Sequence, residues 1–346
     1  MRRGFVICLA IAAFLLTIDS EAQMNRKRIK KNNRSIAHFK GKKRGFDPAK
    51  KYNALGISLN ALNYYGDIAP LPNRISTDIG FTRPAIGASF THRFGPFYQL
   101  TAGFSYGTLA GSDAESADPS DDNSAYRYVR NLSFRNRIKE LSVVGQFDLF
   151  PNQGTYISRV RWSPFAYVGL AVFHHNPQAQ NADGEWVNLQ PLGTEGQYAQ
   201  LSPTDVNYGI KPYKLIQLAI PFGIGARFRV NEVIDISAEF GFRYLFTDYI
   251  DDISQNYVNL DLLSDEAKAF SYRSNLVNPS SSPLVAERLA NTHPTLTYNG
   301  SPLINGYGHE DQYSWRGNKN DRDIYTITTI RLTYILGKTF HRAKFR

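Results

Sequence analysis

A group of carboxylates in the second half of the chain is the first candidate for chemistry. Asp248, Asp251 and Asp252 lie within five consecutive positions of the sequence "FTDYIDD". Grouped carboxylates can bind calcium, but the ligand spacing and the glycine of an EF-hand loop are missing here. The alternative is a solvated turn at the end of a strand, in which these side chains hold no metal. We favour the solvated turn and expect no cofactor.

Two adjacent histidines, His174 and His175, form the second candidate, because imidazole binds metals and serves as a general acid or base. They follow the apolar segment 164–173 and end a predicted strand. Adjacent strand residues point to opposite faces, so the two imidazoles cannot easily bind one ion. A hydrolase site of histidine, serine and aspartate at a membrane rim is the alternative. The sequence contains no CxxC, HExxH or P-loop motif, and we expect a protein that is not an enzyme.

The elements that would position these side chains are strands, because apolar residues recur at every second position in most of eight segments. The fifth segment is apolar on both faces and leaves its register open. The apolar faces extend over about 9–14 residues, which suits tilted transmembrane strands of roughly 9–11 residues. The eight segments are 55–61, 86–93, 98–107, 141–149, 164–173, 216–229, 234–246 and 329–336.

The polar faces of these segments carry charged residues. An arginine that faces lipid near the bilayer midplane costs about 2–4 kcal/mol, so these side chains must point into a barrel, where opposite charges can pair. A barrel of about eight strands is only just wide enough for side chains to fill it, so no general diffusion pore is expected. The predicted interior charges are Arg93, Asp148, Arg227, Arg229, Asp235, Glu239, Arg243 and Arg331.

The connections between the segments alternate in length, at about 15, 3, 27, 11, 38, 2 and 75 residues. Outer-membrane barrels combine long extracellular loops with short periplasmic turns. We therefore predict an all-β fold over residues 52–346, an eight-stranded antiparallel transmembrane β-barrel of OmpA/OmpX-like size with both termini in the periplasm. Ser264 should cap a short helix in the last loop that continues to about Leu276. On this topology the aspartates mark the emergence of segment 234–246 from lipid, with Tyr249 at the interface.

The N-terminal region predicts export to the cell outer membrane. Residues 1–22 have the basic, apolar and small-residue regions of a signal peptide, and they contain the single cysteine, Cys8. Residues 23–51 form a basic arm, because twelve Lys or Arg residues and one acid lie between positions 26 and 51. Such a segment should be disordered when unbound. Export argues against nucleic acid and favours anionic lipid, another envelope polymer or an acidic protein surface as its partner. The binding residues proposed for the arm are Arg26, Lys27, Arg28, Lys30, Lys31, Arg34, Lys40, Lys42, Lys43 and Arg44.

The segment 130–140, "RNLSFRNRIKE", alternates basic and polar residues at the entry to the fourth strand. It could bind the phosphates of lipopolysaccharide. The alternative is a solvated extension of the strand above the membrane, and we favour that extension.

Five segments resemble the PorG-like outer-membrane β-barrels of the Bacteroidetes type IX secretion and gliding machinery. The resemblance implies a non-enzymatic envelope component that associates with a periplasmic ring of the PorK lipoprotein and PorN, and that anchors this ring at the outer membrane. It covers nearly all of the chain from about residue 52. The segments are "LNYYGDIAP" (62–70), "RNLSFRNRIKELSVVGQFDLFP" (130–151), "PFAYVGLAVFHHNP" (164–177), "EFGFRYLFTDYIDDIS" (239–254) and "RGNKNDRDIYTITTIRLTYIL" (316–336).

Two other functions fit the same strand pattern. A generic OmpA-like barrel would act structurally or in adhesion through its long outer loops, and a narrow channel would conduct through its interior. No small-molecule substrate is indicated by the sequence, and the expected surroundings of the barrel are outer-membrane lipids.

Overall fold

The computed structural model describes residues 46, 50–68, 81–298, 301–304, 316–320 and 322–337. The chain divides into two compact units, Met1–Gly45 and Phe46–Arg346. The predicted signal peptide and all ten basic residues assigned to the arm belong to the first unit and lie outside the described residues.

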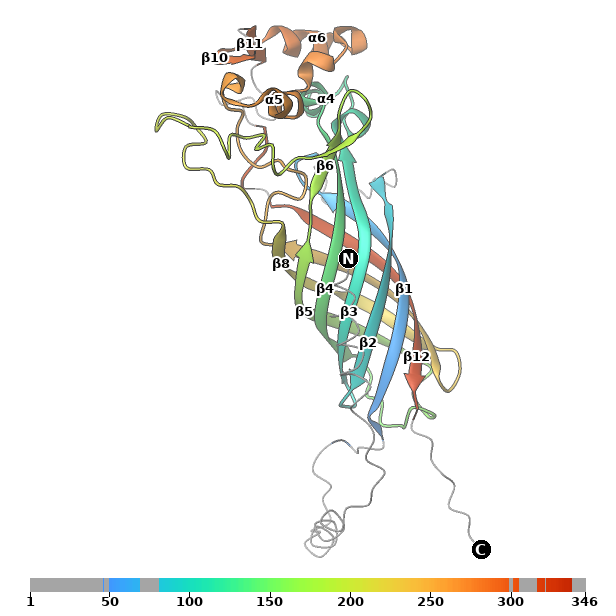
Figure 1. Cartoon of the computed structure of the whole chain (residues 1–346). Helices are drawn as coiled ribbons and strands as arrows, with labels where there is room; N and C mark the ends of the chain where they lie inside the picture. Colours follow the sequence, from blue (N-terminus) through green and yellow to red (C-terminus); the bar gives the residue numbers. More distant parts are fainter. Residues whose placement is uncertain are drawn as a thin grey trace, which may run out of the picture. The chain divides into compact units, whose positions relative to one another are not determined.

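Eight long antiparallel strands form a closed barrel, because the first strand pairs with the last (Figure 1). This confirms the eight-stranded antiparallel barrel predicted from the alternating pattern. The structure also places the chain's entry into the barrel beside its exit, since Asn53 pairs with Leu336. The barrel strands are β1 (Tyr52–Tyr65), β2 (Arg83–Arg93), β3 (Tyr98–Ser112), β4 (Ser133–Asp148), β5 (Trp162–His174), β8 (Ile216–Arg229), β9 (Ile234–Leu245) and β12 (Ile324–Leu336).

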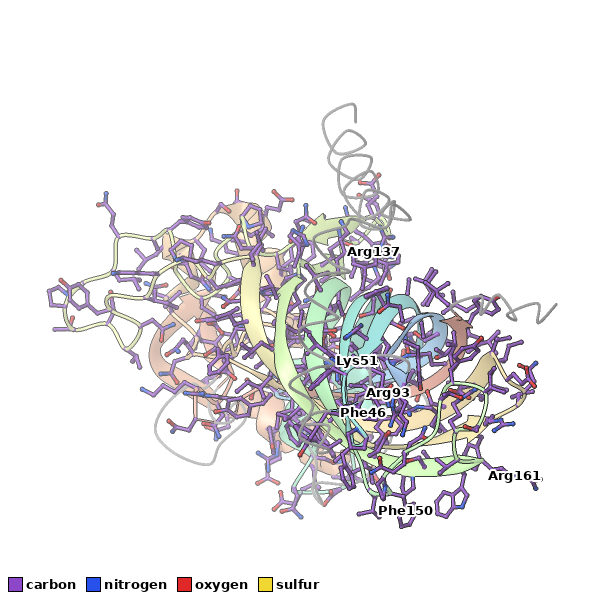
Figure 2. All side chains as sticks on the ribbon, turned by 90° about the horizontal axis from the view of Figure 1, so that it is seen from below. Phe46, Lys51, Arg93, Arg137, Phe150 and Arg161 are labelled. Atoms are coloured by element: carbon purple, nitrogen blue, oxygen red, sulfur yellow. The ribbon has the colours of Figure 1, made fainter. Side chains whose placement is uncertain are left out.

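Side chains alternate between the interior and the exterior of the barrel along each strand. On β5, whose register the sequence left open, Phe165 and Tyr167 are buried inside, whereas Leu170 is 70% exposed outside. Figure 2 shows Arg93 within the ring of strands and Phe150 outside it. Large exposed apolar side chains recur in this way on all eight strands. Such a surface is stable against lipid and not against water, so the chain is a membrane-spanning β-barrel.

The two ends of the barrel differ in their connections. The short turns 94–97, 149–161 and 230–233 lie at the end where the chain enters and leaves the barrel. The opposite end carries four long loops: L1 (66–82), L2 (113–132), L3 (175–215) and L4 (246–323). The predicted sorting of long and short connections to opposite ends is therefore present in the structure.

The long loops contain short elements, which Figure 1 shows gathered at this end of the barrel. The short helix predicted in L4 is confirmed, and the Ser264 side chain caps it by accepting a hydrogen bond from the Ala267 N–H. It ends at Ser271 instead of near Leu276, because the chain is extended at Tyr272 before a separate 3-10 turn. None of the helices in the described ranges is long and apolar enough to cross a membrane. The elements are α3 (Asp113–Ser116), α4 (Ala125–Arg130), β6 (Pro177–Gln180), β7 (Trp186–Asn188), η3 (Leu260–Leu262), α5 (Asp265–Ser271), η4 (Ser274–Leu276), η5 (Pro279–Ser281), α6 (Pro283–Ala290), β10 (Thr292–Tyr298) and β11 (Ser301–Ile304).

Two apolar clusters hold the long-loop end together. One joins inward side chains of the strands, such as Phe134 and Phe173, to Ile250 and Ile253 of L4. The other joins Val129 of L2 to buried residues of L4. Burying a large apolar side chain contributes about 1.5–3 kcal/mol to the stability of the folded state. The two clusters therefore stabilise the folded conformation of the long loops.

Candidate functional site

The charges predicted for the interior lie inside the barrel, and most of them are paired. Near the short-turn end, Asp148 receives Arg227 at 3.0 Å and Arg93 at 3.6 Å. Gln99 donates a further hydrogen bond to the same carboxylate at 3.1 Å. Two cations thus share one buried carboxylate, and Arg93 itself is 0% exposed.

Two more pairs cross the middle of the barrel. Arg243 contacts Glu140 at 2.9 Å, and Arg331 contacts Glu239 at 3.0 Å. The Tyr325 hydroxyl donates at 2.6 Å to the same Glu140 oxygen that Arg243 Nε contacts. The Arg243–Glu140 contact is bidentate and charge-assisted, and contacts of this kind fix the side chains in one arrangement.

At the short-turn end, both Asp235 and Arg229 contact Arg159. Arg159, from the turn 149–161, lies 2.6 Å from Asp235, and Arg229 donates to the Arg159 carbonyl oxygen at 2.8 Å. Arg159 is not among the predicted charges, because nothing in an irregular turn shows that its side chain folds back under the barrel. Glu140 is not among them either, although its alternation with Leu141 places it on the interior face.

These pairs leave little free space in the lumen. Two cavities among the described inward side chains measure about 50 and 20 Å³. The larger lies between the Arg243–Glu140 and Arg331–Glu239 pairs. A cavity needs about 10–15 Å³ of water-accessible volume to hold one water, so the larger cavity holds a few waters and the smaller holds about one.

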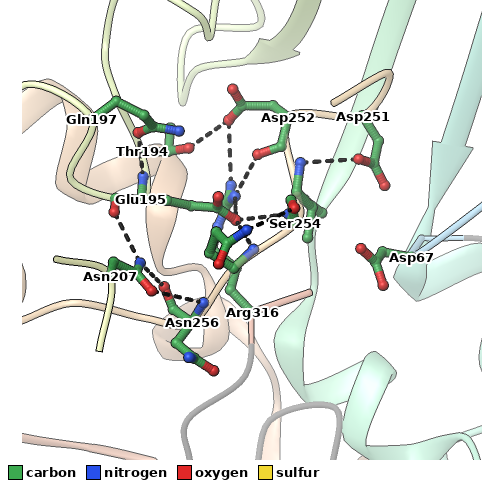
Figure 3. A network of polar contacts seen from close by, with 12 residues as sticks. Asp67, Thr194, Glu195, Gln197, Asn207, Asp251, Asp252, Ser254, Asn256 and Arg316 are labelled. Atoms are coloured by element: carbon green, nitrogen blue, oxygen red, sulfur yellow. Dashed lines mark hydrogen bonds and ion pairs between the residues drawn. The ribbon is translucent and has the colours of Figure 1, made fainter. Parts of the chain in front are cut away.

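A second polar network lies above the barrel, in the long loops, and its first centre is Arg316 (Figure 3). The guanidinium is 1% exposed and lies 3.0 Å from Glu195 of L3. It also contacts Asp252 of L4, donating to the backbone oxygen at 2.6 Å and approaching the carboxylate at 3.5 Å. Thr194 and Tyr213 donate to the Asp252 carboxylate at 2.5 and 2.6 Å. Arg316 therefore joins the two ends of L4 to L3.

Arg130 is the second centre and joins the remaining loops. It forms a bidentate pair with Asp113, at 2.8 Å from each oxygen, within L2. The same guanidinium donates to the backbone oxygens of Asp67 in L1 and Arg316 in L4, at 2.5 and 2.8 Å. Arg130 connects L1, L2 and L4, and Arg316 connects L3 to L4. Together the two arginines link all four long loops.

The interpretation of the aspartates as a solvated turn is wrong. Asp251 is 1% exposed and Asp252 is 0% exposed, while Asp248 is partly buried. Tyr249 does not mark an interface, because its ring stacks on Tyr213 at 4.6 Å. The physical reason is that L3 and residue Arg316 fold over the end of β9 and supply the hydrogen bonds and positive charge that water would otherwise supply.

The calcium alternative has no support in the described part of the chain, where no three His, Cys, Asp or Glu side chains are arranged to hold a metal ion. The oxygens of Asp252 already accept bonds from Thr194, Tyr213 and Arg316. Their role in the structure is to hold loops together.

The hydroxyl of Tyr64 shows that a proton is shared in this network. It lies 2.6 Å from one oxygen of Asp251 and 2.7 Å from one oxygen of Asp323. A phenol has one proton to donate and can only accept from a second partner, so one of the two carboxyl groups must carry a proton. Gly66 permits this approach, since a Cβ there would lie 2.0 Å from both the Tyr64 hydroxyl and Asp323.

The raised pKa values of the buried aspartates agree with a proton on Asp251 or Asp323. Burial raises the pKa of Asp251 to about 7 and that of Asp248 to about 8. Burial also raises the pKa of Asp252 to about 6, against the opposing charge of Arg316. Burial and the charge of Asp251 raise the pKa of Asp323 and Asp67 well above the usual range. The network is therefore partly protonated near neutral pH.

The two histidines do not act together. His174 lies at an outward position of β5, whereas His175 is fully buried beside Tyr213, and its Nε2 lies 3.0 Å from the Lys214 carbonyl oxygen. Burial lowers the pKa of His175 to about 4. A neutral, buried imidazole stacked on Tyr213 at 5.8 Å packs the base of L3.

The segment 130–140 is only partly the solvated extension that we favoured. Arg130 is 2% exposed, because Asp113 and the backbone oxygens of L1 and L4 surround it. The remainder, from Ser133, continues β4 and pairs with β3 up to Ser112. Arg137 and Lys139 are exposed on this extension.

Comparison with known proteins gives one family match and several solved structures. A family model described as "Domain of unknown function (DUF6089)" matches residues 46–191. No curated protein sequence matches the chain.

The solved structures include outer membrane protein OprG from Pseudomonas aeruginosa (TM-score 0.35, 8% identity, 85% of this chain and 99% of that chain). They also include Ail, the attachment invasion locus protein of Yersinia pestis, in complex with the heparin analogue sucrose octasulfate (0.34, 6%, 83% and 99%). A third is Neisserial surface protein A, NspA (0.34, 7%, 82% and 96%).

Proposed function

We propose that this chain is a non-enzymatic outer-membrane component of the type IX protein secretion system, which anchors or assembles the periplasmic ring at the outer membrane. The assignment to this system rests on the resemblance of five sequence segments to PorG-like barrels. The contribution of the structure is to favour an anchor over a conduit.

The observation that supports an anchor is the filled lumen. Four buried carboxylates, Asp148, Glu140, Glu239 and Asp235, each pair with at least one arginine inside the barrel. Separating a buried ion pair is strongly unfavourable, because each charge would lose its partner. If these ion pairs stay formed, nothing passes through the lumen. We therefore propose that the barrel works by binding other molecules at its outer surfaces.

The proposed orientation follows from the connections. Short turns face the periplasm in outer-membrane barrels, and long loops face outward. The turns 94–97, 149–161 and 230–233, together with the first and last strand ends at Tyr52 and Leu336, would then meet the periplasmic ring. The basic arm 23–51 precedes β1 and would reach the same partners, PorK- or PorN-type proteins, or the inner lipid surface.

A structural or adhesive barrel is the second candidate, and a specific observation favours it. L3 exposes Tyr198, Val206 and Tyr208, at 56–60% each. Exposed aromatic side chains on a loop held by buried ion pairs are suited to contact another surface. This candidate would act through L3 at the outer face, without the periplasmic ring.

Deletion of the gene distinguishes the two functions. Under the type IX proposal, proteins that carry the type IX C-terminal signal should accumulate inside the cell, because the ring loses its attachment to the outer membrane. The measurement is the fraction of such a protein in the culture medium, which we expect to fall to the background released by cell lysis. A plasmid copy of the intact gene should restore secretion.

Loss of adhesion with normal secretion would instead support the adhesive barrel. A plasmid copy in which Tyr198 and Tyr208 are both replaced by serine provides the matched variant. It should restore secretion under the type IX proposal, and it should fail to restore adhesion under the adhesive one.

A further inference from the structure

The outer surface of β4 carries a row of cations. Alternate residues of this strand point outward, and the outward row passes from the exposed Val143 and Leu141 to Lys139, Arg137 and Arg135. The outward face of β4 thus changes from apolar to basic between Leu141 and Lys139, which are neighbouring outward residues. Figure 2 shows Arg137 at the outside of the ring of strands.

This row has no counterpart of opposite charge on the barrel exterior. The outward positions of the eight long strands, all of which the structure describes, hold no Asp or Glu. Within the described ranges, neither Arg137 nor Lys139 forms an ion pair, and both are exposed. The barrel interior, by contrast, pairs Arg243 and Arg331 with carboxylates. An unpaired basic row therefore remains available to an external anion.

The row lies at the boundary of the apolar surface. Lys139 is paired in register with Tyr106 of β3 on one side and with His174 of β5 on the other. Leu141, the next outward residue on β4, is 62% exposed. Tyrosine is enriched where a membrane protein passes from hydrocarbon to headgroups, so the cations are at headgroup height at the long-loop end.

The β6–β7 hairpin holds the Arg135 side chain in place. Arg135 donates to the Gln178 side chain at 2.8 Å, and Gln178 donates in turn to Asn188 at 2.8 Å. The Arg135 guanidinium also lies over the Trp186 ring, 3.6 Å from its centroid. Stacking and hydrogen bonding orient a guanidinium before it meets an anion, which reduces the entropy lost on binding.

We propose that Arg135, Arg137 and Lys139 bind the phosphate groups of an anionic lipid in the leaflet at the long-loop end. Alternate residues of a strand are about 6.7 Å apart, so the three cations extend over about 13 Å and suit a headgroup with more than one phosphate. Their alkyl stems lie beside apolar strand surface while the charged ends reach the headgroups. The contiguous apolar belt favours a lipid over a soluble phosphate compound.

The test compares lipid binding by the full-length protein and a double variant, Arg137→Gln with Lys139→Gln. These two side chains are exposed and make no ion pair within the described residues, so folding should be unaffected. The probe is lipid A, titrated into detergent-solubilised protein and counted as bound adducts by native mass spectrometry. We expect at least about a tenfold loss of affinity for the variant, since each cation near an anionic surface contributes about fivefold. The loss should shrink at high salt, which screens exposed charges.

Matched controls make the result decisive. Arg161→Gln with Lys319→Gln removes the same charge from exposed positions elsewhere and should bind lipid A as the native chain does. Neutral phosphatidylcholine should bind both variants equally, and inorganic phosphate should not compete at millimolar concentration. Equal lipid A affinity in the β4 variant and the native chain, or an equal loss in the control variant, would overturn the proposal.

Discussion

Replacing Arg316 by methionine should release the long loops from one another while leaving the barrel intact. The substitution keeps much of the side-chain volume but leaves Glu195 and Asp252, both 0% exposed, without their cation. Removing one partner of a buried ion pair costs about 3–5 kcal/mol. The barrel strands hold their own pairs, and we expect them to keep their stability.

Amide hydrogen exchange measures this loss locally, because it reports the opening free energy of each segment. Exchange at residues 194–197 and 251–256 should accelerate at least about 100-fold in the variant, which corresponds to about 3 kcal/mol. Arg288→Gln is the matched control, because Arg288 pairs with Asp122 at a side chain that is 68% exposed. Such a surface pair contributes about 0–1 kcal/mol. Similar exchange in both variants would show that Arg316 does not connect L3 to L4.

The long loops should also become less stable as the pH rises. Tyr64, Asp251 and Asp323 need a shared proton, and burial raises the pKa of Asp251 to about 7. In the unfolded chain an aspartate loses its proton near pH 4. Between about pH 4 and pH 7 the folded loops therefore bind more protons than the unfolded ones, and their stability falls with rising pH.

Other charges around this group set the size of the effect. Asp67 and Asp248 add negative charge, and Arg130 and Arg316 oppose it. Asp252, whose pKa is about 6, contributes in the same direction over a lower range. From pH 5 to pH 8 the opening free energy of residues 250–253 should fall by at least about 2 kcal/mol, at about 1.4 kcal/mol for each pH unit and proton.

The variant Asp323→Asn separates this proton from other pH effects. An amide can donate to the Tyr64 oxygen and still accept from the Ile250 N–H, as the protonated carboxyl does. We expect exchange protection in the variant, corrected for intrinsic chemical exchange, to change less between pH 5 and pH 8 than in the native chain. Asp265→Asn alters an exposed carboxylate and serves as the control. Identical pH dependence in the native chain and Asp323→Asn would contradict the shared proton.

The barrel could be predicted from the sequence because the relevant signals are local. Alternation along β9, for example, places Glu239 and Arg243 on the opposite face from Phe240 and Phe242 without any knowledge of the partner strands. A charged side chain that faces lipid is costly, whereas one that faces the lumen can be paired or hydrated. The same reasoning located the strands and the sorting of long and short connections.

The network in the long loops could not be predicted in this way. Arg130 and Arg316 are separated by most of the sequence, and each meets partners from other loops, such as Asp67 and Glu195. Carboxylates at a strand end are usually solvated, so the sequence alone predicts a solvated turn. Their burial depends on how L3 and the end of L4 fold over β9, and no local pattern encodes that fold.

Single-molecule conductance in planar bilayers shows whether the lumen of the barrel is sealed, as the proposed anchor requires. The native full-length chain, labelled so that each inserted molecule is counted, should show no unitary currents. The double variant Glu140→Ala with Arg243→Ala removes a whole pair from the lumen and should give a measurable leak, which shows that inserted barrels can conduct. Stable unitary currents from the native chain, at one channel for each inserted molecule, would show that the lumen conducts and would rule out a sealed anchor.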